Sequence, residues 1–252
     1  MDIVKHNKSA WDNYVEKKDR WTIPATDKEI EDARIGKWGI VLTPKKKVPK
    51  EWFPQLKGLK VLGLASGGGQ QGPILSTLGA DVTIFDNSDK QLEQDNKISN
   101  KFNLGIKTVQ GDMRDLSDFE DNTFDLIFNP CSIVFVDDVL PVWKECYRVL
   151  KPGGVLMTGL INPIIFQLDD ENLQLIYEQP FSDLHSLPKE KLEKLKNDNE
   201  PLVFGHSLSD QIGGQLDAGF TITSMFEDFW DVENKMNQFL PSFIATRAVK
   251  SK

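Results

Sequence analysis

The sequence has few of the residues that build covalent or metal frameworks. It contains two cysteines, Cys131 and Cys146, and three histidines in 252 residues. Two cysteines at this spacing form neither a disulfide framework nor a zinc cluster. We therefore expect a reduced chain without a metal site.

Long apolar runs and excess positive charge are missing as well. No apolar run approaches 18 residues, and the N-terminal stretch MDIVKHNKSAWDNY lacks the apolar core of a signal peptide. The formal net charge is -8, which argues against a large phosphate-binding face. The one basic run, Lys45 to Lys47, lies between prolines and indicates a solvated linker. These absences predict a cytoplasmic protein that binds neither membranes nor nucleic acid.

What the sequence does have, from Lys60 onward, is an alternation of short apolar strands and helices. The predicted strands are KVLGLA, DVTIFD, IKTVQGD, FDLIFNP and VLMTGLI. The predicted helices between them are PILSTLGA, SDKQLEQDNKISNKFN and VLPVWKECYRVL. Strands that alternate with helices at short spacing predict an α/β fold with a doubly wound, mostly parallel sheet.

The remaining segments complete one domain with two additions. Residues 1–57 predict an N-terminal helical extension or lid, with helices near 7–18 and 27–36, and its tryptophans favour core packing over ligand contact. Residues 58–161 form the first half of the core. Residues 162–205 are too long for a plain loop and predict an inserted cap. Residues 206–252 predict a helix from about Ser209 to Ala218 and two closing strands.

The stretch LASGGGQQGP, from Leu64 to Pro73, follows the first strand and opens a helix. Backbone N–H groups and the helix dipole converge there, and glycine lets a ligand approach the backbone without a Cβ in the way. Asp86 ends the next strand, at the same edge of a parallel sheet, where a carboxylate can accept hydrogen bonds from ribose hydroxyls. The loop therefore predicts a nucleotide site.

The loop alone does not choose the nucleotide. Gly67, Gly69 and Gly72 also fit the G-x-G-x-x-G pattern of dinucleotide sites. An NAD(P)-dependent oxidoreductase and a non-catalytic nucleotide-binding module are therefore alternatives. Tyr14 and Lys18 match a Y-x-x-x-K pair, but they precede the loop, and their spacing is that of surface neighbours on a helix.

The order of motifs resembles that of class I S-adenosylmethionine-dependent methyltransferases. VLGLASGGG, VTIFDNS, QGDMRDL, FDLIFNP and LKPGGVL stand in the order of that family's motifs, and DAGF precedes the closing strands. The fuller string resembles a bacterial subgroup of unassigned methyltransferases. The resemblance implies a seven-stranded sheet whose last strand is antiparallel, S-adenosylmethionine as cofactor and a small-molecule methyl acceptor.

The resemblance also implies the cofactor site. Asp86 would bind the ribose, Asp112 the adenine amino group and Met113 the adenine face. Tyr14, Arg20 and Trp21 are candidates for the methionine carboxylate. The other residues expected at the cofactor are Ala65, Ser66, Gly67, Gly69, Gln70, Asn87, Gln91, Gly111, Asn129 and Pro130.

Two positions depart from the family pattern. Gly63 stands where the family commonly has an acidic residue, and Ala65 replaces its first glycine. The missing acid usually helps orient the loop and the amino-acid end of the cofactor. We expect Gln70 and Gln71 to face that end or the acceptor.

Methyl transfer is an in-line displacement at a sulfonium carbon, so it requires alignment and exclusion of water rather than a metal or a covalent intermediate. A base is needed only when the acceptor must lose a proton. His206 precedes the helix that returns from the cap, so we predict that it lies near the active edge of the sheet and is the best candidate for that base.

Overall fold

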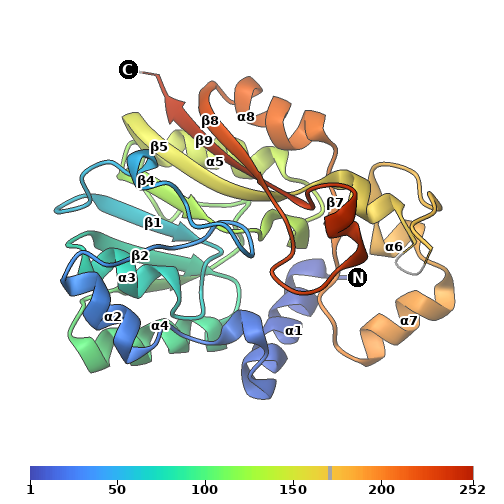
Figure 1. Cartoon of the computed structure of the whole chain (residues 1–252), viewed down its shortest axis with the longest axis horizontal. Helices are drawn as coiled ribbons and strands as arrows, with labels where there is room; N and C mark the ends of the chain where they lie inside the picture. Colours follow the sequence, from blue (N-terminus) through green and yellow to red (C-terminus); the bar gives the residue numbers. More distant parts are fainter. Residues whose placement is uncertain (170–171, 252) are drawn as a thin grey trace.

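The computed structural model describes residues 1–169 and 172–251, which are built around one seven-stranded sheet of order β3-β2-β1-β4-β5-β9-β8 (Figure 1). Strands β1 to β5 are parallel, and β9 runs antiparallel between β5 and β8. This topology confirms the predicted sheet and its antiparallel last strand. The strands are β1 (Lys60–Leu64), β2 (Asp81–Asp86), β3 (Lys107–Gln110), β4 (Phe124–Asn129), β5 (Leu150–Ile161), β8 (Phe220–Asp228) and β9 (Phe243–Lys250).

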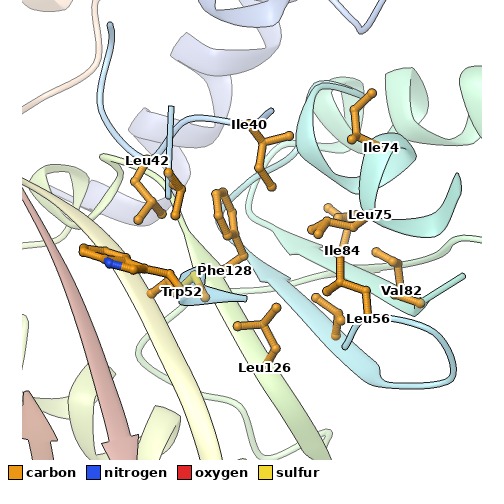
Figure 2. Close-up of a cluster of buried hydrophobic side chains, with 14 of the residues drawn as sticks. Ile40, Leu42, Trp52, Leu56, Ile74, Leu75, Val82, Ile84, Leu126 and Phe128 are labelled. Carbon is orange, nitrogen blue, oxygen red and sulfur yellow. The ribbon is translucent and has the colours of Figure 1, made fainter. Parts of the chain in front are cut away.

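Alternate residues of the strands feed two apolar cores, one on each face of the sheet. Val61 belongs to one core and Leu62 to the other, as expected where successive side chains point to opposite faces. Helices α2 (Asp27–Arg34), α3 (Gln71–Thr77) and α4 (Asp89–Phe102) supply the first core, part of which is drawn in Figure 2. Helices α5 (Leu140–Val149) and α8 (Gly214–Asp217) lie on the second face.

The N-terminal segment begins with α1 (Ile3–Lys17), which starts four residues before the predicted position. The side chain of Asp2 accepts a hydrogen bond from Lys5 N at 3.0 Å and so caps the helix earlier. α1 packs against α4. α2 has a capping box formed by Thr26 and Glu29.

Residues 36–57 form no α-helix and pack into the first core. Ile40, Leu42 and Trp52 are buried there (Figure 2). The carbonyl oxygen of Leu42 would lie 2.1 Å from a Cβ added to Gly159 in β5, so only glycine admits this contact between backbones. The second half of the expected extension is therefore part of the core. The 3-10 turns of the N-terminal segment are Arg20–Thr22 and Lys50–Trp52.

The insertion after β5 carries its own structure, as its length predicted. A 3-10 turn (Pro163–Gln167) leads to the two-stranded pair of β6 (Phe181–Ser182) and β7 (Phe204–Gly205), with α6 (Asp183–Ser186) and α7 (Lys189–Asn197) between them. α6 and α7 lie beyond the end of the sheet, on the side where the chain begins (Figure 1). We call residues 162–205 the cap.

The predicted helix after the cap consists of a π-helix (Ser209–Gly213) that continues into α8. The residues KPGG, which lie between the predicted helix VLPVWKECYRVL and the predicted strand VLMTGLI, belong to an irregular start of β5. The register with β4 shifts there between Phe124 and Leu126, and Gly153 has a φ of 81°. Further 3-10 turns are Ile133–Phe135 and Lys235–Gln238. None of the helices in the described residues is long and apolar enough to span a bilayer.

Candidate active site

A cavity of about 510 Å³ lies at the carboxyl ends of the central strands. Its wall combines the glycine loop after β1, the ends of β2 and β4, α1, the loop at residues 41–44 and the cap. This is the edge at which open α/β sheets bind ligands. The predicted site residues that line it are Tyr14, Trp21, Ala65, Ser66, Gly67, Gln70, Asp86, Asn87, Gln91, Gly111, Asp112, Met113 and Pro130.

The glycine loop turns sharply away from β1. Ala65, Gly68 and Gly69 all have positive φ, at 44°, 109° and 74°. Ala65 thus adopts the left-handed conformation that normally favours glycine, at a cost on the order of 1–2 kcal/mol. A Cβ on Gly67 would lie 3.0 Å from Asp86 Cγ, so glycine permits the close contact between this loop and β2.

The Asp86 carboxylate stabilises the contact between the glycine loop and β2. Its Oδ2 accepts a hydrogen bond from Gly67 N and its Oδ1 accepts one from Ser88 N, both at 2.9 Å. Burial raises the pKa of the carboxyl, and the backbone hydrogen bonds oppose that shift. Each carboxylate oxygen retains a lone pair for a further donor. Asp86 can therefore hold the loop and bind a hydroxyl in the cavity.

Asp112 lies at the same edge, after β3. Its carboxylate accepts hydrogen bonds from Arg114 Nε at 3.0 Å and Nη2 at 2.7 Å, and the same guanidinium contacts Asp137. The Asp112 side chain remains part of the cavity wall beside Met113. A neutralised carboxylate next to an apolar side chain suits a planar ring that carries an amino group.

Comparisons with known proteins agree with this geometry. A family model described as "Methyltransferase domain" matches residues 62–158. The "Uncharacterized methyltransferase YbaJ" of Bacillus subtilis is 51% identical over 253 residues, which cover 98% of this chain and 98% of that protein.

This chain belongs to the methyltransferase family. The fold and the motif order place it in class I, whose methyl donor is S-adenosylmethionine. A putative S-adenosylmethionine-dependent methyltransferase from Listeria monocytogenes has the same fold, with a TM-score of 0.62 at 17% identity over 81% of this chain and 96% of that one. A methyltransferase from Mesorhizobium loti aligns with a TM-score of 0.59 at 18% identity, over 80% of this chain and 95% of the other.

The residues of this methyltransferase fit the cofactor at its nucleoside end. Asp86 and Asp112 offer acceptors for hydroxyl and amino donors, and Met113 offers an apolar face. Ser66 Oγ, Gln71 Oε1 and Gln91 Oε1 belong to lining residues and are buried without a partner among the described residues. Buried polar atoms without partners are costly in a folded protein, which is consistent with a site that a polar ligand completes.

Gln70 and Gln71 both line the cavity. Gln70 Nε2 donates to the carbonyl oxygen of Trp21 at 2.8 Å, and Gln71 Nε2 donates to Gln70 Oε1 at 3.4 Å. These amides connect the glycine loop to the segment after α1. Whether they face the amino-acid end of the cofactor or the acceptor stays a prediction.

Asp95 of α4 holds the glycine loop by hydrogen bonds to its backbone, and it was not among the residues predicted from the sequence. It is fully buried, and its Oδ2 accepts hydrogen bonds from Gly68 N at 2.9 Å and Gly69 N at 3.1 Å. Burial raises its pKa to about 8, and the nearby charge of Asp86 contributes. The sequence did contain a pattern that could have indicated Asp95. It follows Leu92 by three residues, so both lie on the buried face of the helix, where an acidic residue is unusual.

Packing around Gly63 explains why no acidic side chain stands there. A Cβ at this position would lie 2.5 Å from Ile84 Cδ1 and 2.6 Å from Ser66 Oγ. Both distances are shorter than a non-bonded contact allows. β1 thus has no room for a side chain at position 63. The carboxylate that contacts the glycine loop comes from Asp95 on α4 instead.

We expect Gly63→Ala to lower the free energy of unfolding by about 1–3 kcal/mol, because it overpacks the core. Adding Ile84→Val removes Cδ1, the nearest atom, and should recover part of that loss. Urea unfolding of both variants and of Ile84→Val alone measures the coupling between the two sites. Additive effects in the double variant would contradict the proposed clash.

Four predicted site residues lie outside the described wall of the cavity. Gly69 directs its carbonyl oxygen to Ala25 N at 2.8 Å. Asn129 is fully buried and binds Leu64 O and Thr158 Oγ1, so it ties β1 to β4 and β5.

Arg20 and His206 are the other two. The Arg20 guanidinium pairs with Asp231 at 2.6 Å and lies over the ring of Trp21 at 4.2 Å, and Arg20 is not among the described lining residues. His206 is buried, its Nε2 lies 3.0 Å from Ile133 O, and burial lowers its pKa. His206 is not among the described lining residues and its ring packs against the turn after β4, so its role as catalytic base stays a prediction that this contact does not favour.

The tryptophans divide between the two roles considered for them. Trp52 is in the first core, whereas Trp11 and Trp21 line the cavity. Tyr14 also lines it, and its hydroxyl donates to Glu200 in the cap. α1 therefore serves as a wall of the site and contacts the cap across it.

Proposed function

We propose that this methyltransferase transfers the methyl group of S-adenosylmethionine to a small-molecule acceptor that binds in the same cavity. The observation that carries the proposal is the continuity of the cavity, which extends from the glycine loop and Asp86 to α1 and the cap. One space can thus hold the donor and the acceptor together. The net charge of -8 further disfavours a polyanionic acceptor such as nucleic acid.

Each end of the cofactor would be bound by different residues of the cavity wall. Asp86 binds the ribose hydroxyls, Asp112 accepts from the adenine amino group and Met113 packs on the ring. Gln70 and Gln71 bind the amino-acid end. These roles account for the position of each side chain in the cavity wall.

When bound, the cofactor supplies a methyl group on a positively charged sulfur, which an acceptor atom can displace. The chain then has to orient the acceptor and exclude water. Val134, Phe135 and Val136, which follow β4, supply apolar wall on the acceptor side of the glycine loop. The cap and α1 close that side.

Calorimetric titration tests the proposal. We expect S-adenosylhomocysteine, the product form of the cofactor, to bind at one site per chain, and NAD to give no heat of binding under the same conditions. Binding of NAD without binding of S-adenosylhomocysteine would contradict the proposal. Competition between S-adenosylmethionine and S-adenosylhomocysteine for the same site provides the control.

A further inference from the structure

The cavity has an unusual charge balance for a site that must attract a substrate. Among residues 1–169 and 172–251, the lining contains no lysine, arginine or histidine. It contains four carboxylates: Asp86, Asp112, Asp183 and Glu200. Two belong to the proposed cofactor end and two belong to the cap.

The two carboxylates of the cap belong to the part of the cavity wall that lies outside the proposed cofactor residues. Asp183, the first residue of α6, has an exposed fraction of 4%, and its Oδ2 accepts from Val203 N at 2.7 Å. Its Oδ1 has no partner among the described hydrogen bonds. Glu200 follows α7 and accepts from the hydroxyl of Tyr14, which leaves its other oxygen available.

Aromatic rings line the same cavity, and the ring of Tyr14 contacts Glu200 through its hydroxyl. Trp11 meets Tyr14 edge to face with centroids 5.4 Å apart, and it meets Phe135 in the same way at 5.0 Å. Trp230 and Phe243 form a second edge-to-face pair at 4.6 Å on the wall. The negative faces of aromatic rings attract cations, and their area binds apolar groups.

The lining itself has no cationic side chain among the described residues, and two of the arginines next to it in sequence are paired with carboxylates. Arg114, next to Met113, is paired with Asp112 and Asp137. Arg20, next to Trp21, is paired with Asp231. An anionic acceptor would therefore lose its hydration in the cavity without gaining a cationic partner, which is strongly unfavourable.

We propose that the methyl acceptor is an apolar amine that binds against Asp183 and Glu200 among these aromatic rings. The proposal rests on the proposed methyl transfer and names its substrate class. An alkylammonium ion enters, gives a proton to a cap carboxylate and becomes a neutral amine. The nitrogen lone pair then forms the N–C bond while the C–S bond breaks and its electron pair stays on sulfur. The product is again an ammonium ion, the cap carboxyl releases the proton it took to water, and both carboxylates then stabilise the product.

Matched ligands test the charge preference. The probes are 2-(2-naphthyl)ethylamine, the corresponding alcohol and 3-(2-naphthyl)propanoate, together with the same three head groups on phenyl and indolyl rings. Each is titrated into the full-length protein saturated with S-adenosylhomocysteine. We expect amines to bind at least about tenfold more tightly than the carboxylates of the same ring, a difference well within the range of one desolvated ion pair. Tighter binding of the carboxylates, or no binding of any amine, would overturn the proposal.

Conservative variants locate the preference. Asp183→Asn keeps an oxygen for Val203 N, and Glu200→Gln keeps one for Tyr14. We expect each to weaken amine binding about tenfold or more and to leave the affinity for the alcohol unchanged. Glu193→Gln, on the exposed part of α7, is the matched control and should behave as wild type. An unchanged amine affinity in both cap variants would remove Asp183 and Glu200 from the acceptor site.

Different results would contradict the proposed methyl transfer and the proposed substrate class. If S-adenosylhomocysteine does not bind, the proposed methyl transfer is wrong. If it binds and the amine preference is absent, only the substrate class is wrong.

Discussion

Replacing Asp95 by alanine is expected to lower the free energy of unfolding by about 1–3 kcal/mol, because it leaves buried N–H groups of the glycine loop without their acceptor. Gly69 N loses its described partner, whereas Gly68 N keeps a second contact to Gln91 O at 3.1 Å. A loosened loop should also bind S-adenosylhomocysteine more weakly. Urea unfolding and calorimetric titration of the same preparations measure both effects.

Asp95→Asn is the matched variant, because it keeps the shape and one acceptor oxygen but cannot ionise. In the wild type the folded pKa of about 8 lies above the usual value of 3.8. The stability that Asp95 contributes is thus full below the unfolded pKa and is lost as pH rises toward 8. We expect Asp95→Asn to gain stability relative to wild type across that window. Equal pH dependence in both proteins would contradict the buried, protonated state of Asp95.

Replacing Asp86 by alanine is expected to weaken binding of S-adenosylhomocysteine by about 1.5–3 kcal/mol, the range for hydrogen bonds to a charged group. At 25 °C this corresponds to an increase in Kd of roughly 10- to 150-fold. The loss has two sources, since Asp86 also accepts from Gly67 N within the loop. Calorimetric titration gives the dissociation constant directly.

Asp86→Asn separates the two sources, because it keeps one acceptor for the loop and removes the charge. We expect its Kd to lie between those of wild type and Asp86→Ala. Asp89→Asn provides the control, since Asp89 is exposed, pairs with Lys8 and is not part of the described cavity wall. A wild-type Kd for Asp86→Ala would remove Asp86 from the cofactor site.

Local patterns predicted those parts of the fold that depend on neighbouring residues. The apolar strand, the glycine loop and the helix after it occur in succession, so β1, its turn and α3 could be recognised together. Asp86 could be placed because parallel strands end at a common edge. The cap could be expected from its length and polarity.

Contacts between distant segments were beyond such patterns. His206 was predicted near the active edge because it precedes the helix that follows the cap. Its ring instead forms a hydrogen bond with Ile133 O. Arg20 was expected to bind a carboxylate of the cofactor, and it pairs with Asp231, 211 residues away. In each case a polar side chain pairs with a residue that is distant in sequence and becomes its neighbour only in the folded protein.

The sequence by itself determined the strand–loop–helix order, the cofactor edge of the sheet and the methyltransferase family, because these follow from residues close together in the chain. The tertiary structure alone decided how the loop is held and what surrounds the acceptor. Asp95 reaches the glycine loop from α4, and a side chain at Gly63 would clash with Ile84, because α4, β1 and β2 meet only after folding. The acidic, aromatic end of the cavity likewise forms only when α1, the turn after β4 and the cap come together. The identity of a side chain limits the reactions and contacts that it can make. Its burial and its neighbours in the folded protein decide which of these contacts it does make.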